Sequence, residues 1–86
     1  MEDFIQKLTT LLLAQFPGAQ LDIELATPGT KVGGFLIWPG FEGKEQIDRQ
    51  TNVWDVLRHR LPRDEQLRIA AILTMTPQEI AGIQEG

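Results

Sequence analysis

The sequence predicts an α+β fold in which helices cover one face of a three-stranded sheet, with a short C-terminal helix. Three patterns support this prediction: apolar residues at helical spacing near the N-terminus, strict apolar-polar alternation after them, and a nearly continuous apolar run later in the chain. Because the alternating strand has only one apolar face, helices are needed on only one side of the sheet. With 86 residues, we expect a single domain over residues 1–86.

Residues 2–16 carry apolar side chains three and four positions apart, which indicates an amphipathic helix that a Pro-Gly pair ends. In residues 20–25 apolar and polar side chains alternate, and the polar positions include Asp22 and Glu24. This alternation predicts a strand with one buried face and one acidic face in contact with water. We interpret the two carboxylates as solvated side chains rather than as an acid and base pair.

Turn residues separate this strand from a second one. Residues 27–30, Thr-Pro-Gly-Thr, contain proline and glycine, each of which fits a backbone conformation that turns require. Residues 32–38 predict the second strand, which Pro39 ends. Gly33 and Gly34 inside this strand indicate a bulge or a close approach of two backbones.

The second half of the chain predicts further helix and a last strand. Apolar residues between positions 45 and 61 fall on a helical stripe, and the polar stretch 49–52 interrupts the stripe at a point that favours two helices. Pro62 ends this pattern. Residues 67–73 then form an apolar run that is typical of a central strand, although periodicity alone leaves a helix open.

Three residues predict the start of the final helix. Thr76 is a favourable N-cap, Pro77 fits the first helical position, and Glu79 is placed to bond back to the N-cap backbone. This capping box satisfies donors at the helix end that otherwise have no partner. A short final helix is therefore expected from Pro77.

The composition excludes several kinds of site. The chain has no cysteine, no serine and one histidine, so disulfides, thiolate metal sites and serine-hydrolase triads are ruled out. That histidine, His59, lies between two arginines and has no carboxylate or cysteine partner in sequence, so we interpret it as a solvated residue at a helix end. We expect no enzymatic activity, no catalytic or metal-binding residue and no cofactor.

The charge and the N-terminus suggest a location and limit the partners. A formal net charge of -4 opposes non-specific attraction to phosphate backbones. The apolar run at residues 11–14 is too short to cross a bilayer, and the acidic start is unlike a signal peptide. We expect a cytoplasmic protein that does not contact membranes.

The predicted element order and several motifs resemble the BolA family, small proteins with a class II K-homology-like α-β-β-α-α-β fold. Residues 41–44, Phe-Glu-Gly-Lys, match the family's F-x-G-K turn. Residues 49–54 occupy the R-H-R-x-V-Y position and keep its first arginine, its valine and an aromatic residue. Residues 74–79 match the end of the last strand followed by T-P-x-E. The resemblance implies a small regulatory protein of this type.

The chain departs from the family where iron-sulfur cluster ligands are implied. Family members carry a histidine in the last strand, and Ala70 occupies that position here. The loop between the first two strands often holds a cysteine or histidine in the family, but residues 26–33 contain neither. Alanine has no donor atom for iron, so this chain lacks the ligands that the resemblance would use. We expect partner contact at Trp38, Phe41 and Ala70.

A group of cations in the second half has two interpretations. Between residues 44 and 63 there are five cations against three anions, a local balance of +2. They are either an ordinary solvated helix face or, as the family resemblance implies, a helix-turn-helix-like face for nucleic acid. The five residues are Lys44, Arg49, Arg58, Arg60 and Arg63.

Two functions of different classes therefore follow from the sequence. The first is a non-enzymatic adaptor that docks a partner protein, a monothiol glutaredoxin by family resemblance, without donating a cluster ligand. The second is a nucleic-acid-binding transcriptional regulator that uses the basic helix face. They differ in their salt dependence, because nucleic-acid affinity falls steeply as salt rises.

Overall fold

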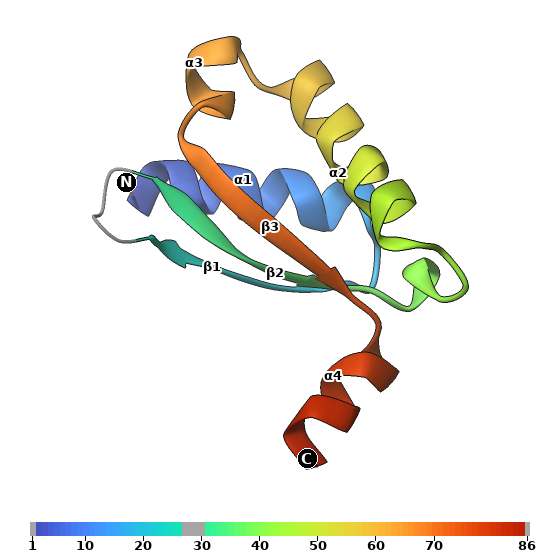
Figure 1. Cartoon of the computed structure of the whole chain (residues 1–86). Helices are drawn as coiled ribbons and strands as arrows, with labels where there is room; N and C mark the ends of the chain where they lie inside the picture. Colours follow the sequence, from blue (N-terminus) through green and yellow to red (C-terminus); the bar gives the residue numbers. More distant parts are fainter. Residues whose placement is uncertain (1, 27–30, 86) are drawn as a thin grey trace.

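The computed structural model describes the backbone of residues 2–26 and 31–85, and the side chains of residues 2–26 and 31–82 (Figure 1). The predicted turn at residues 27–30 lies outside the described residues. The elements along the chain are α1 (Glu2–Gln15), β1 (Gln20–Leu25), β2 (Val32–Ile37), a 3-10 turn (Pro39–Phe41), α2 (Gln46–Arg60), α3 (Arg63–Gln66), β3 (Ile69–Met75) and α4 (Pro77–Glu85).

The three strands form one mixed sheet in the order β1-β2-β3. The strand β2 lies in the centre, antiparallel to β1 and parallel to β3. Because parallel neighbours need a long crossover, α2 and α3 fill the connection between β2 and β3. The α+β fold with a three-stranded sheet, predicted from the alternating strand and the helical stripes, is confirmed.

Helices α1 and α2 lie on the same face of the sheet, α1 against β1 and α2 against β3 (Figure 1). Their apolar stripes and the covered face of the sheet form the core. Helix α4 projects from the end of β3, away from α1 and α2 (Figure 1). The fully buried core side chains are Leu8, Leu12, Val32, Leu36, Phe41, Val53 and Leu57.

Gly33 and Gly34 occupy an irregular point of the sheet, as their positions in the strand predict. The pairing of β2 with β3 shifts register between Val32 and Gly33, which leaves Ala70 as the extra residue of a bulge in β3. A Cβ atom on Gly34 would lie 1.7 Å from the backbone oxygen of Asp22 in β1. Only glycine therefore allows this approach of the two strands.

Two sequence predictions about the second half are corrected by the structure. The polar stretch 49–52 lies inside one continuous helix, α2, and the break to α3 comes at Pro62 instead. The last strand covers residues 69–75 rather than 67–73, and it is an edge strand rather than a central one. It is apolar on both faces because Ala71 and Leu73 lie exposed on the face opposite α1 and α2.

Candidate functional site

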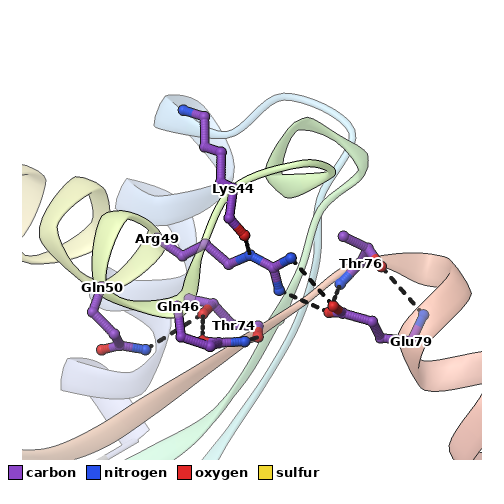
Figure 2. A network of polar contacts seen from close by, with 7 residues as sticks. All are labelled: Lys44, Gln46, Arg49, Gln50, Thr74, Thr76 and Glu79. Carbon is purple, nitrogen blue, oxygen red and sulfur yellow. Dashed lines mark hydrogen bonds and ion pairs between the residues drawn. The ribbon is translucent and has the colours of Figure 1, made fainter.

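Arg49 is a buried cation that connects three parts of the chain (Figure 2). Only 5% of the residue is exposed. Its guanidinium donates two hydrogen bonds to the Glu79 carboxylate, Nη1 to Oε1 at 2.7 Å and Nη2 to Oε2 at 3.2 Å. Its Nε atom donates a third to the backbone oxygen of Lys44 at 2.9 Å. This bidentate geometry fixes the start of α4 against the start of α2.

The carboxylate of Glu79 also completes the capping box that the sequence predicts. The backbone N–H of Thr76 donates to Glu79 Oε1 at 2.9 Å, and the backbone N–H of Glu79 donates to Thr76 Oγ1 at 3.2 Å. The hydrogen bonds from Arg49 and from the Thr76 backbone lower the pKa of Glu79 below its ordinary value of 4.5. We refer to Arg49, Glu79 and Thr76 as the clamp.

Two glutamines on α2 bond to the outer edge of β3 (Figure 2). Gln50 Nε2 donates to the backbone oxygen of Ile72 at 2.7 Å, and Gln46 Nε2 donates to the backbone oxygen of Thr74 at 3.0 Å. Thr74 Oγ1 in turn donates to Gln46 Oε1 at 2.7 Å. An edge strand normally leaves such carbonyls free to pair with another chain. Here Gln46 and Gln50 donate hydrogen bonds to these carbonyls instead.

Trp38 and Phe41, two of the predicted partner contacts, belong to an aromatic cluster. Phe41 is fully buried, and its ring lies 5.1 Å from that of Trp38 in an edge-to-face arrangement. The ring of Phe16 lies 5.1 Å from that of Trp38 and 5.7 Å from that of Phe41, so the three rings contact one another. The indole of Trp38 is half-buried, and its Nε1 donates to the backbone oxygen of Pro17 at 2.9 Å. The two side chains thus join α1 to the end of β2, and Phe41 is not on the surface.

Ala70, the third predicted partner contact, is exposed on the face of the sheet that α1 and α2 leave uncovered. We call this the open face. It borders a shallow hollow that Ala70 shares with Gly33, Phe35, Ala71 and Leu73. Phe35 and Leu73 are 38% and 52% exposed, so the centre of the open face is apolar. Two acidic side chains on β1, Asp22 and Glu24, also lie on the open face, where they pair across the sheet with Phe35 and Gly33.

The five predicted nucleic-acid contacts do not form one surface. Arg49 is buried in the clamp, and Lys44 precedes α2 by two residues. Arg58 and Arg60 lie at the other end of α2, about 20 Å from Lys44 at 1.5 Å per helical residue. Arg63 begins α3 and lines a hollow together with Arg58. The exposed cations of the set are therefore divided between the two ends of α2.

Among the described side chains of residues 2–26 and 31–82, no group of three or more histidine, cysteine, aspartate or glutamate residues is placed to bind a metal ion. His59 is exposed, and its Nδ1 lies 2.7 Å from the backbone oxygen of Asp55 one turn earlier in α2. No described helix is long and apolar enough to cross a membrane.

The fold is similar to that of a known structure. The crystal structure of a Bol-like protein from Babesia bovis aligns with 98% of this chain and 93% of its own, with a TM-score of 0.59 and 20% sequence identity. No protein-family model and no curated protein sequence matches the chain. The chain therefore has a BolA-like fold, as the F-x-G-K, arginine and T-P-x-E motifs predict.

The sequence did not indicate the role of two residues. Gln46 and Gln50 are polar residues on a helix, and nothing local distinguishes them from solvated side chains. Their spacing of four places both on one side of α2, which was the one available signal. Their partners lie 28 and 22 residues away in β3, so only the folded chain reveals their function.

Proposed function

We propose that this protein is a non-enzymatic adaptor of BolA type that docks a partner protein through its open face. The observation that supports this most is the exposed apolar centre formed by Phe35, Ala70, Ala71 and Leu73. It lies at the position where the family resemblance implies contact with a monothiol glutaredoxin. The proposal leaves Phe41 and Arg49 out of the contact surface because both are buried.

The proposed adaptor binds without donating a ligand to the partner's iron-sulfur cluster. Ala70 stands where the family has histidine, and its methyl group has no lone pair for iron. The shallow apolar hollow next to the two carboxylates of Asp22 and Glu24 contributes contact area and charge, but no metal ligand. The cytoplasmic location expected from the composition stays a prediction.

Mixing the protein with a cluster-loaded monothiol glutaredoxin tests this function. We expect co-elution in size-exclusion chromatography with no change in the visible absorption of the cluster. Replacing Leu73 with Asp places a charge in the centre of the open face and should abolish co-elution. Leu67→Asp is the matched control, since Leu67 is 64% exposed but lies at the end of α3. Failure of the unmodified protein to co-elute would refute the docking proposal.

The Ala70→His variant separates docking from ligation. Adding an imidazole at the family's position should produce a change in the visible spectrum of the complex. Ala71→His is the control, because it places the same group one residue away on the same strand. If the unmodified protein already changes the cluster spectrum as a histidine ligand does, the absence of ligation is disproved.

Nucleic-acid binding remains the second candidate, and one observation favours it. Arg58 and Arg63 line one hollow at the junction of α2 and α3, and Trp54, an aromatic residue of the kind on which bases stack, lines the same hollow. An electrophoretic shift with single- and double-stranded oligonucleotides tests it. We expect Arg58→Gln with Arg63→Gln to weaken such binding and to reduce its salt dependence. Lys44→Gln, at the other end of α2, is the control.

A further inference from the structure

The backbone of β1 presents hydrogen-bonding groups at the edge of the sheet. The backbone N–H of Ala26 bonds to the oxygen of Lys31 in the chain that leads to β2. Because inward and outward groups alternate along an antiparallel edge strand, the N–H and C=O groups of Leu21, Ile23 and Leu25 point away from β2. No side-chain hydrogen bond reaches them among the described residues, in contrast to the edge of β3.

The helix beneath β1 extends the surface of this edge. Lys7 of α1 forms an ion pair with Glu65 of α3, so this flank of α1 faces the other helices. Thr9 and Leu13 lie on the opposite flank by helical periodicity, which directs them toward the outer side of β1. Leu13 is 39% exposed. If a further strand paired with the edge of β1, the side chains on its helix-side face would cover Leu13.

The charges at this edge select the partner. Asp22 and Glu24 are exposed on the open face of β1, two residues apart and therefore on the same side of the strand. A second copy of β1 would bring the same charges opposite each other, which is unfavourable. A strand with lysine or arginine at alternate positions would instead place its cations beside these carboxylates.

We propose that the edge of β1 binds an extended partner segment that alternates basic and apolar residues and adds a fourth strand to the sheet. The segment's backbone pairs with Leu21, Ile23 and Leu25, its cations lie beside Asp22 and Glu24, and its apolar side chains contact α1 near Leu13. This mode of recognition takes affinity from the backbone bonds and specificity from alternate side chains. It adds a surface to the open face and does not depend on docking of a glutaredoxin.

Titration with a capped eight-residue peptide of alternating lysine and valine tests this proposal. Backbone amide exchange, followed by NMR, should show new protection at Leu21, Ile23 and Leu25. A peptide with the same composition in two blocks, four lysines then four valines, should bind at least tenfold more weakly. An alternating peptide with N-methylated backbone at every valine should lose the protection if these amides form the bonds to β1. Equal binding of the block peptide overturns the proposal.

Neutral variants test the role of the two carboxylates. Asp22→Asn with Glu24→Gln should weaken binding of the alternating peptide about three- to tenfold, the range for loss of two cross-strand charge pairs. Glu42→Gln with Asp48→Asn is the matched control, because both residues are exposed and the double change removes the same net charge. The control should bind like the unmodified protein. An equal loss in both variants shows a general charge effect and overturns the specific site.

The residues whose amides become protected from exchange show whether the peptide binds elsewhere or a second copy of the protein occupies the edge of β1. New protection at Ile72 or Thr74 instead would place the peptide at the edge of β3 and refute the proposal. Protection of Leu21 and Ile23 that rises with protein concentration in the absence of peptide would identify a second copy as the occupant, which also refutes it. If the alternating peptide does not bind at any attainable concentration, the proposal is also refuted.

Discussion

The two edges of the sheet differ in how their backbone groups are satisfied. At β3, the outward-facing backbone oxygens of Ile72 and Thr74 accept hydrogen bonds from Gln50 and Gln46. Directly after the strand, the backbone N–H of Thr76 donates to Glu79. Along β1, the corresponding groups have no side-chain partner among the described residues. The protein thus covers one edge with residues from α2 and α4 and leaves the other available for contact.

This difference is a consequence of chain topology. The parallel pairing of β2 and β3 requires a helical crossover, and that crossover brings α2 beside the edge of β3. The antiparallel pair of β1 and β2 needs only a short connection, so no helix follows the outer side of β1. Edge protection at β1 therefore depends on its charged side chains.

The largest expected effect comes from removing the clamp at the end of β3. Arg49→Met leaves the backbone oxygen of Lys44 without its donor and removes two charge-assisted hydrogen bonds to Glu79. We expect the free energy of unfolding to fall by about 3 kcal/mol, as measured by urea denaturation. Arg58→Met, which breaks only the exposed pair with Asp55 at 3.4 Å, should change it by less than about 0.5 kcal/mol. Similar values for the two variants would show that Arg49 is not structural.

Removing the glutamines should make the two edges alike. Gln46→Ala with Gln50→Ala leaves the oxygens of Ile72 and Thr74 without their donors, and we expect a loss of about 2 kcal/mol in urea denaturation. Amide exchange along β3 should also become faster. Thr51→Ala on the exposed side of α2 is the control and should have little effect on either measurement. Unchanged exchange along β3 contradicts the assigned role of the glutamines.

The clamp also predicts a dependence of stability on pH. Because folding lowers the pKa of Glu79, its ion pair contributes fully above the ordinary value of 4.5 and is lost as the pH falls below that value toward the lowered pKa. The free energy of unfolding should therefore decrease below pH 4.5 more steeply in the unmodified protein than in Glu79→Gln. Parallel pH profiles for the two proteins would exclude this contribution.

The smallest expected effect concerns the charges that protect β1. Replacing Asp22 and Glu24 with threonine removes like charges from the edge and favours extended structure. We expect weak, concentration-dependent association in sedimentation velocity, with stability nearly unchanged. Glu42→Thr with Asp48→Thr, away from the edge, should remain unassociated. If neither variant associates, charge is not what keeps the edge of β1 free.

Local patterns predict the elements of this fold where the partners are close in sequence. The stripe of apolar residues in 2–16 corresponds to α1, the alternation in 20–25 to β1, and Thr76 with Glu79 to the capping box at α4. Each of these three predictions depends on contacts between residues close in sequence, or on apolar residues that recur on one face of a helix or strand. The glycine pair also predicted two features of β2: the register shift against β3 next to Gly33, and the close approach of Gly34 to β1, which only glycine permits.

The predictions for the second half were wrong where a polar residue has a distant partner. Arg49 and Gln50 belong to the polar stretch 49–52 that was interpreted as an interruption of the helix, yet both of them, like Gln46 one turn earlier, bond to β3 or α4. Thr74 likewise extends β3 beyond the apolar run because Gln46 satisfies its hydroxyl group. The open edge of β1 could not be predicted at all, since strand order is set by the long crossover.

The separation of Arg49 and Glu79 in the sequence has a consequence for synthesis of the chain. Arg49 leaves the ribosome thirty residues before Glu79, so α2 emerges without the carboxylate that its buried guanidinium needs. Burying that charge without its partner costs about 3 kcal/mol or more. The nascent protein should therefore keep α2 loosely docked until the start of α4 has been made, and a ribosome stalled before that point would display an incompletely folded domain to chaperones.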